Sequence, residues 1–248
     1  MSDSSVVEGR RCAVDMARDL RLSWSMQIER DRTPSGKDLF RVPERFPLFP
    51  LPNVVFFPKM YLPLHIFEPR YRAMVADAAA GERCIGMVLL KEGWEQDYYG
   101  NPPIFEMGCV GRLVSVQPLP DGRYNILLQG LHRFEVREQY FEKSYREARA
   151  ALQPAEADAP LGPSVRRELL RVLEPYLASH EDGHQWQELV RPDVDDEVLV
   201  NSLATYLDLT PLEKQFLVEA DGLLQRASRL RDLIQFKLDE RGGVQGCG

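Results

Sequence analysis

Cysteine and histidine are both scarce in this sequence, with four of each among 248 residues. The four cysteines, Cys12, Cys84, Cys109 and Cys247, lie far apart and include no CxxC pair. This spacing argues against a disulfide framework or a zinc site and favours a reducing, cytoplasmic compartment. Long apolar runs are also missing, since no stretch approaches the ~18 apolar residues of a membrane span, and the first residues lack the apolar core of a signal peptide. Neither a membrane protein nor a secreted one is expected.

Basic residues are also fewer than acidic ones. The chain has 31 Lys and Arg against 38 Asp and Glu, for a formal net charge of −7. Proteins that bind nucleic acid need a basic surface to neutralise phosphates, so nucleic acid is not expected as a partner. RNA binding stays open as an alternative only if Arg112, Arg123, Arg133 and Arg137 form a basic strip.

The common catalytic signatures are missing. The sequence has no phosphate-binding loop of either the GxxxxGK[ST] or the GxGxxG type, no GxSxG elbow and no HExxH pair. We therefore expect no catalytic residues, no cofactor and no metal. His180 and His184 have the spacing of two helical metal ligands, but a glycine lies between them and a solvated loop is expected. His65, Glu68 and Arg70 could form an acid–base set, although a hydrogen-bonded histidine beside a surface ion pair is favoured.

Changes in composition divide the chain into five segments. Residues 1–42 follow neither a helical nor a strand period and are expected to form a poorly ordered extension. Residues 43–154 carry short, proline-punctuated strand patterns, and 155–163 have the Pro, Ala and acidic composition of a linker. Residues 164–241 have the apolar stripes of a helical bundle, and 242–248 are expected to be a disordered tail.

Several local signals predict particular elements. Residues 70–80 favour a helix that ends at Gly81, and Asp121-Gly122 between two alternating runs predicts a hairpin. The return strand is expected to stop at Gly130, at a bulge or bend. Within the helical part, a kink or break is expected at Pro175. Cys84 and Cys109 fall in apolar strand patterns and are expected to be core residues.

A helix start is predicted with particular clarity at Thr210. The sequence Thr-Pro-Leu-Glu places an N-cap hydroxyl, a first-turn proline and the acidic residue of a capping box in order.

Aromatic side chains gather in the polar loop between two predicted strands. Trp94, Tyr98 and Tyr99 lie in this loop, and Phe105 follows two prolines at its end. Aromatic residues on a loop supply contact area for another chain at low entropic cost, so these four are candidate peptide-binding residues. The alternative is that they fold back as a lid on the strands. The two interpretations are weighted equally.

Three runs of sequence carry a family resemblance: FPLFPLPNVVFFPKMYLPLHIFEPRYRAMV, PPIFEMGCVGRLVSVQPLPDGRYNILLQGLHRF and YREARAALQP. Together they resemble the N-terminal, substrate-binding domain of Lon protease over about residues 45–154. Residues 161–241 resemble, more loosely, the helical subdomain that follows it. The resemblance implies an α+β fold, a PUA-like β pseudo-barrel followed by a C-terminal α-helical bundle.

The resemblance also bears on activity. The chain is similar to stand-alone LON-domain proteins, without the ATPase module or the Ser/Lys protease module of Lon, so no catalytic residue carries over. It implies a non-catalytic module that binds unfolded or apolar peptide segments or a protein partner, as an adaptor in protein quality control. The alternatives are an enzyme with a site unrelated to Lon and a PUA-like RNA-binding protein.

Overall fold

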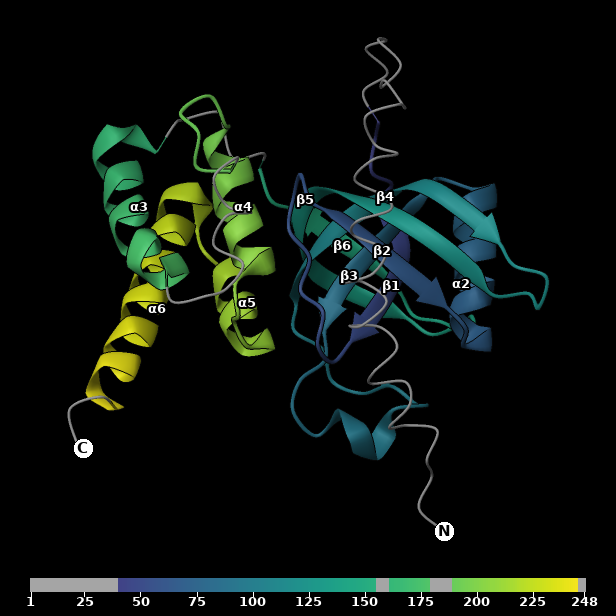
Figure 1. The fold of residues 1–248 in the computed structure, drawn as a ribbon. Helices are drawn as coiled ribbons and strands as arrows, with labels where there is room; N and C mark the ends of the chain where they lie inside the picture. The colour runs from purple at the N-terminus through teal and green to yellow at the C-terminus, as the bar shows by residue number, and fades with distance from the viewer. Residues whose placement is uncertain (1–39, 155–160, 179–188, 245–248) are drawn as a thin grey trace.

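A computed structural model describes residues 40–154, 161–178 and 189–244 of the chain. Within these ranges a six-stranded sheet is combined with five α-helices and one short 3-10 helix, η1 (Figure 1). The elements in chain order are β1 (Arg45–Leu51), β2 (Tyr61–Ile66), α2 (Pro69–Ala80), β3 (Cys84–Leu89), η1 (Trp94–Asp97), β4 (Met107–Pro118), β5 (Tyr124–Tyr140), β6 (Glu147–Leu152), α3 (Gly162–Ala178), α4 (Asp196–Tyr206), α5 (Pro211–Val218) and α6 (Gly222–Val244).

The strands have the order β2-β5-β4-β3-β1-β6, and β6 also pairs with β5. The pairings therefore run in a ring from β1 through β3, β4, β5 and β6 back to β1, with β2 attached outside it. Only β1 and β3 pair in parallel, and all other pairs are antiparallel. Residues 141 and 143–146, between β5 and β6, line one pocket together with Arg70 and Tyr71 at the start of α2.

The predicted hairpin is present, and its return strand is longer than expected. Gly122 occupies the turn between β4 and β5 with a φ of 80°, a left-handed conformation that favours glycine. The register shifts where Val110 pairs with His132 and Gly111 with Gly130, so a bulge lies at the predicted place. The prediction that the strand stops at Gly130 was wrong, because β5 continues through the bulge to Tyr140.

Other boundaries agree with local sequence signals. Helix α2 begins with Pro69 and ends at Ala80, next to the predicted Gly81. The capping box is confirmed, since the Thr210 hydroxyl accepts a hydrogen bond from the Glu213 amide at 3.2 Å and the Glu213 carboxylate accepts one from the Thr210 amide at 2.6 Å. A kink or a break was predicted at Pro175; helix α3 continues past it to Ala178, so the break is absent.

The segment boundaries differ in detail from the predicted ones. Helix α6 extends to Val244, so the backbone of the first three residues of the predicted tail is helical. Helix α3 already begins at Gly162, inside the predicted linker, while 155–160 lie outside the described residues. Residues 1–39 of the predicted extension also lie outside them. Phe40 and Val42 pack against a core cluster, so ordered contacts begin before residue 43.

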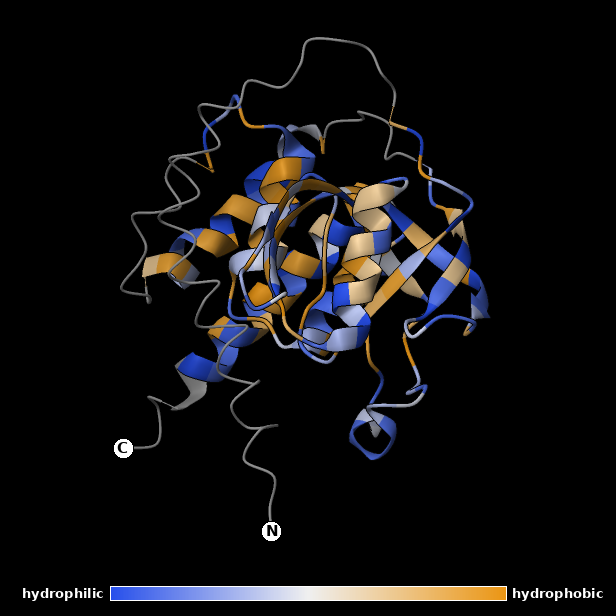
Figure 2. Ribbon diagram, turned by 90° about the vertical axis from the view of Figure 1, so that its right-hand side faces the viewer, coloured by the Kyte–Doolittle hydropathy of each residue, from blue (hydrophilic) through white to orange (hydrophobic). Residues whose placement is uncertain are grey.

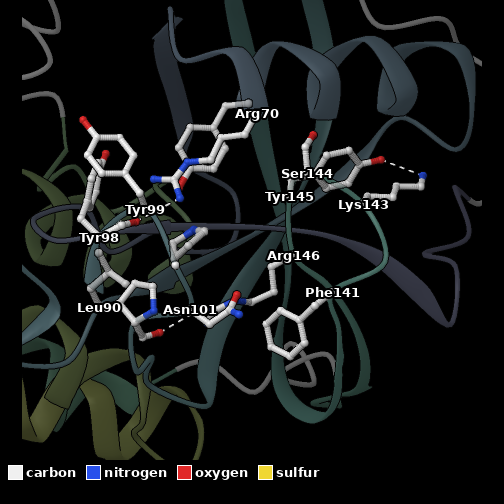
Figure 3. Close-up of a pocket in the computed structure, with 14 residues that line it drawn as sticks. Arg70, Leu90, Tyr98, Tyr99, Asn101, Phe141, Lys143, Ser144, Tyr145 and Arg146 are labelled. Carbon is white, nitrogen blue, oxygen red and sulfur yellow. Dashed lines mark hydrogen bonds between the residues drawn. The ribbon is translucent and has the colours of Figure 1, made fainter. Parts of the chain in front are cut away.

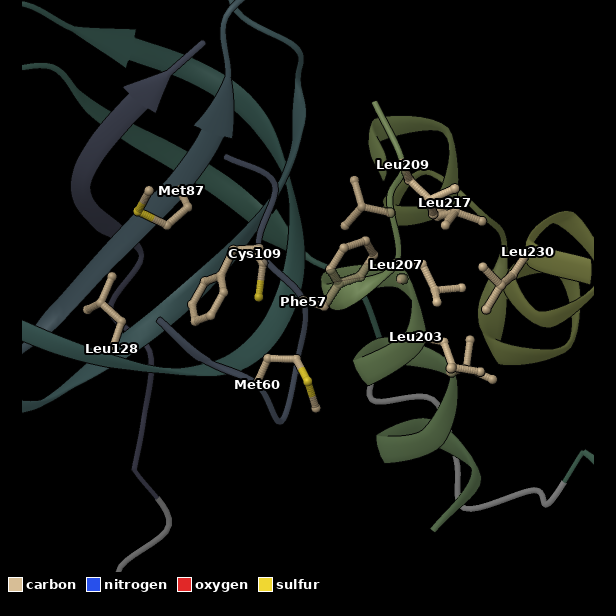
Figure 4. Packing of buried hydrophobic residues seen from close by; sticks show 14 of the residues in the cluster. Phe57, Met60, Met87, Cys109, Leu128, Leu203, Leu207, Leu209, Leu217 and Leu230 are labelled. Atoms are coloured by element: carbon tan, nitrogen blue, oxygen red, sulfur yellow. The ribbon is translucent and has the colours of Figure 1, made fainter. Parts of the chain in front are cut away.

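Helices α3 to α6 lie on one side of the strands and α2 on the other (Figure 1). Figure 2 shows polar and apolar residues interspersed along the strands and helices. One large apolar cluster runs from the sheet into the helices, with Phe57 and Cys109 on the strand side and Leu203 and Leu217 on the helical side (Figure 4). The helices therefore bury apolar surface against the strands as well as against one another.

Buried polar groups join the same two parts. Asn201 of α4 donates to the Pro58 carbonyl at 3.0 Å, and Gln215 of α5 donates to the Met107 carbonyl at 3.0 Å. Arg133 of β5 donates to the carbonyls of Val218 and Ala220. No helix in the described part of the chain is long and apolar enough to cross a bilayer.

Candidate functional site

The loop that carries the candidate aromatic residues is anchored at its base. A bridge between Leu90 and Ile104 closes the loop, and the amides of Lys91 and Phe105 donate to Pro103 and Leu89 at 2.8 and 2.9 Å. The 3-10 helix η1 forms within it. The aromatic side chains are therefore presented from a loop whose two ends are fixed to the sheet.

Two of the four candidates have a lid-like position. Trp94 and Tyr98 are half-buried and pack against the smaller core cluster. Their ring centroids lie 5.4 Å apart, in an edge-to-face arrangement. The Tyr98 hydroxyl donates to the Glu68 carboxylate at 2.5 Å. Burial and this hydrogen bond raise the pKa of Tyr98, so its hydroxyl stays protonated. These contacts favour a structural role for this pair of side chains.

Of the other two candidates, only Tyr99 is strongly exposed to solvent. Tyr99 is 79% exposed, with its ring centroid 5.1 Å from that of Tyr98. Phe105 is half-buried, and the Lys91 ammonium lies 5.6 Å from its ring centroid. The loop therefore combines a packed inner layer with one strongly exposed ring. That this loop binds peptide stays a prediction.

A pocket of about 220 Å³ lies beside the loop (Figure 3). Its walls come from Pro50 of β1, the first turn of α2, Leu90 and residues 98–102 of the loop, and residues 141 and 143–146 before β6. Figure 3 shows Tyr98 and Tyr99 on one side and Phe141 and Lys143 on the other, with Arg70 and Arg146 contributed by separate elements. The ring-like strand pairing brings these distant segments together.

Arg70 is held among aromatic rings. Its Nε donates to Glu68 at 3.1 Å and its Nη1 to the Tyr98 carbonyl at 3.0 Å. Its guanidinium carbon lies 4.5, 4.8 and 5.8 Å from the ring centroids of Tyr71, Tyr98 and Tyr99. Its Nη2 is buried and has no hydrogen-bond partner among the described residues. A donor in this state is costly unless something binds it.

Arg146 is the second arginine of the pocket and is only 7% exposed. Its Nη2 donates to the Pro102 carbonyl at 3.0 Å, and its guanidinium carbon lies 5.4 Å from the Phe141 ring centroid. No carboxylate in the described ranges lies within ion-pair distance of it. Burial lowers the pKa of Arg146, and the positive charge of Arg70 lowers it further. The sequence predictions included Arg70 but missed Arg146.

The proposed acid–base set does not come together. The two ring nitrogens of His65 lie 2.8 Å from the Asn125 amide oxygen and 3.1 Å from an Arg123 nitrogen. Glu68 is paired with Arg70 instead. This is the hydrogen-bonded histidine that the sequence favoured, although the Glu68–Arg70 pair is partly buried and not on the open surface, with side chains 15% and 18% exposed.

The basic strip required for RNA binding does not form. Arg133 is 7% exposed and its guanidinium donates to the helical part. Arg123 and Arg137 are paired with Asp121 and Glu135. An exposed row of the four arginines named from the sequence is therefore not present.

The predicted core cysteines are confirmed. Cys84 and Cys109 are buried and free, and burial raises the pKa of the Cys84 thiol to about 12. In the residues that the structure describes, no group of His, Cys, Asp and Glu side chains could hold a metal ion. His180 and His184 lie outside those residues.

A family model for the substrate-binding domain of ATP-dependent protease La (LON) matches residues 45–235. The chain belongs to the LON substrate-binding domain family. Lon protease 2 of Myxococcus xanthus is 29% identical to this LON domain over 205 residues, which make up 79% of the chain and 24% of the relative. Lon protease of Anaeromyxobacter dehalogenans is 30% identical over 202 residues, with the same two shares. The chain thus spans about a quarter of the length of these curated relatives.

Two solved structures have a similar fold. The N-terminal domain of Mycobacterium avium complex Lon protease aligns with a TM-score of 0.59 and 17% identity, covering 77% of this LON domain and 98% of that chain. A Lon N-terminal domain protein from Xanthomonas campestris aligns with a TM-score of 0.57 and 21% identity, covering 75% and 96%. The similarity is to the substrate-binding region of Lon and not to its ATPase or protease modules.

Proposed function

We propose that this LON domain is a non-catalytic module that binds unfolded or apolar polypeptide segments, as an adaptor in protein quality control. The observation that carries the proposal is the family match over residues 45–235, because that family is the substrate-binding part of Lon. The site chemistry is consistent with it, since His65 and Glu68 are engaged with other partners.

We further propose that the fold is a PUA-like pseudo-barrel followed by a helical bundle. The ring of strand pairings through β6 supports the first part. The packing of α6 against α3, α4 and α5 supports the second.

The proposed binding surface includes the loop from Trp94 to Phe105, with Tyr99 as its main anchor. A ring that is 79% exposed, on a loop fixed at both ends, can pack on a client with little loss of conformational freedom. The half-buried Trp94 and Tyr98 would support that ring from beneath.

Fluorescence anisotropy with a labelled, permanently unfolded polypeptide tests this function. We expect saturable binding by the full chain, and a roughly five- to thirtyfold loss of affinity on Tyr99→Ala, equivalent to about 1–2 kcal/mol. Phe236→Ala is the matched control, because Phe236 is 57% exposed on α6, outside the loop. The absence of binding by the natural chain would contradict the proposed function. Equal losses for both variants would contradict the role of the loop.

A further inference from the structure

The pocket beside the loop has an unusual charge balance for this chain. The whole protein has a formal net charge of −7, yet the side chains that line the pocket include Arg70, Lys143 and Arg146 and no Asp or Glu. Lys143 is compensated by Asp77 at 3.1 Å and Glu147 at 3.6 Å, and Arg70 by Glu68 at 3.1 Å, all from outside the lining. Arg146 has no carboxylate within ion-pair distance in the described part of the chain, and the charge of Asp97 acts on it only from farther away.

A buried guanidinium without a direct ion-pair partner is an unfavourable arrangement. Of its three nitrogens, only Nη2 of Arg146 has a hydrogen-bond acceptor among the described residues, the Pro102 carbonyl. The N–H groups on Nε and Nη1 remain for a ligand. In a guanidinium the Nε–H group points to the side of Nη2 and away from Nη1, so these two groups act as separate donors, each able to give a charge-assisted hydrogen bond to a carboxylate oxygen.

Arg70 adds a second donor to the same pocket. Its Nη2 has no partner in the described ranges, and the neighbouring Tyr99 ring is the most exposed aromatic side chain of the lining, at 79%. The Arg70 guanidinium carbon lies 5.8 Å from the centroid of that ring, so a ligand that reaches Arg70 would also contact Tyr99. At about 220 Å³ the pocket has room for several water molecules, and hence for a carboxylate with part of its residue.

We propose that this pocket binds a carboxylate group of a peptide through Arg146 and Arg70, with Tyr99 and Phe141 packing on the residue that carries it. Phe141 is 51% exposed at the pocket rim and supplies apolar contact opposite Tyr99. The carboxylate can come from the C-terminus of a chain or from an Asp or Glu side chain. The inference rests on the proposed peptide-binding function and adds the chemical group that is recognised.

The proposal is tested by measuring how tightly the full natural chain binds three labelled peptides that share one apolar sequence apart from the change named for each. The first has a free C-terminal carboxylate, the second a C-terminal amide, and the third an amide with one internal Asp. We expect the free acid, the Asp peptide or both to bind about tenfold or more tightly than the plain amide, as charge-assisted hydrogen bonds require. Tighter binding of the free acid or of the Asp peptide identifies the source of the carboxylate. The overall negative charge of the protein favours the opposite order, so this result cannot arise from net charge.

The outcomes separate this inference from the function on which it rests. Equal affinity for all three peptides overturns the carboxylate site and leaves peptide binding intact. Failure of all three to bind overturns both. The peptide comparison uses the unmodified protein, so it does not depend on whether any variant folds.

A pair of variants then assigns the site. Arg146→Gln removes the charge and keeps an amide donor for Pro102, so the preference for the carboxylate peptide should disappear. Arg137→Gln is the control, because Arg137 is an exposed arginine paired with Glu135 and is absent from the pocket lining. A carboxylate preference that persists in a folded Arg146→Gln protein would overturn the assignment to this pocket.

Discussion

Glu68 organises the side chains around the pocket although it does not line it. One of its carboxylate oxygens accepts from the Tyr98 hydroxyl at 2.5 Å, and the other accepts from Arg70 at 3.1 Å. The Glu68 side chain is 15% exposed, so these charge-assisted hydrogen bonds are partly shielded from water. A single carboxylate therefore fixes the loop to the start of α2 and sets the orientation of one pocket arginine.

Removal of the Tyr98 hydroxyl tests this role. We expect Tyr98→Phe to lower the free energy of unfolding by about 1–2 kcal/mol, because a partly buried carboxylate loses a donor. Tyr99→Phe removes the corresponding hydroxyl of the adjacent residue, which is 79% exposed, and should change the free energy of unfolding by less than about 0.5 kcal/mol. Urea denaturation followed by circular dichroism measures both. Equal effects of the two changes would argue against a specific role for the Tyr98–Glu68 bond.

The residues of the pocket differ in how far they could be predicted from the sequence. The aromatic loop could be singled out because its residue types are unusual for a polar connection. Arg146 carries no comparable signal, since it is far from Arg70 in the sequence and surface arginines are common. Its burial results from the pairing of β6 with both β1 and β5, which is a long-range property.

Elements were predictable where local chemistry decides them. The Asp121-Gly122 turn and the Thr210 capping box each depend on a few adjacent residues, and both are present. The prediction of a strand end at Gly130 was wrong because the glycine serves a tertiary contact and does not end the strand. A Cβ at this position would lie 2.1 Å from the Phe57 carbonyl oxygen, so glycine permits a close approach between segments while β5 continues. The parallel pairing of β1 with β3 is likewise decided by distant contacts.

The start of α5 offers a test at the scale of one element. Thr210→Ala removes the hydroxyl that accepts from the Glu213 amide, and should destabilise the protein by about 1 kcal/mol. Thr210→Ser keeps a capping hydroxyl and should stay within a few tenths of a kcal/mol of the natural chain. Thermal or urea unfolding of the three proteins gives the comparison. A Ser variant as unstable as the Ala variant would show that the methyl group, and not the cap, is responsible.

At the scale of the whole molecule, the division at residues 155–163 separates two patterns of sequence, while the core is continuous across it. The large apolar cluster contains Phe57 and Met60 on one side and Leu203 and Leu217 on the other. Buried hydrogen bonds from Asn201, Gln215 and Arg133 reinforce the contact. Periodicity could show that the two parts differ in secondary structure, but it carries no information on how they pack together.

Cleavage of the connection tests whether this interface holds the parts together. With a specific protease site inserted between Ala155 and Pro160, we expect the two fragments to elute as one species on size-exclusion chromatography after cutting. The expectation follows from the shared apolar cluster, because separation would expose its side chains to water. Fragments that elute separately, each folded by circular dichroism, would instead establish two independent units.

A variant of Asn201 tests whether a specific hydrogen bond across the interface holds the cut fragments together. Its amide donates to the Pro58 carbonyl of the strand part, and its oxygen accepts from the fully buried Arg226 at 2.9 Å. Asn201→Ala leaves the Pro58 carbonyl without this donor and should weaken the association of the cut fragments by about 1–3 kcal/mol. Thr205→Ala on the same helix is the control, because among the described residues the Thr205 hydroxyl bonds within α4, to the Asn201 carbonyl at 2.7 Å. Equal dissociation of the two cut variants would mean that the Asn201 contact contributes nothing specific to the interface.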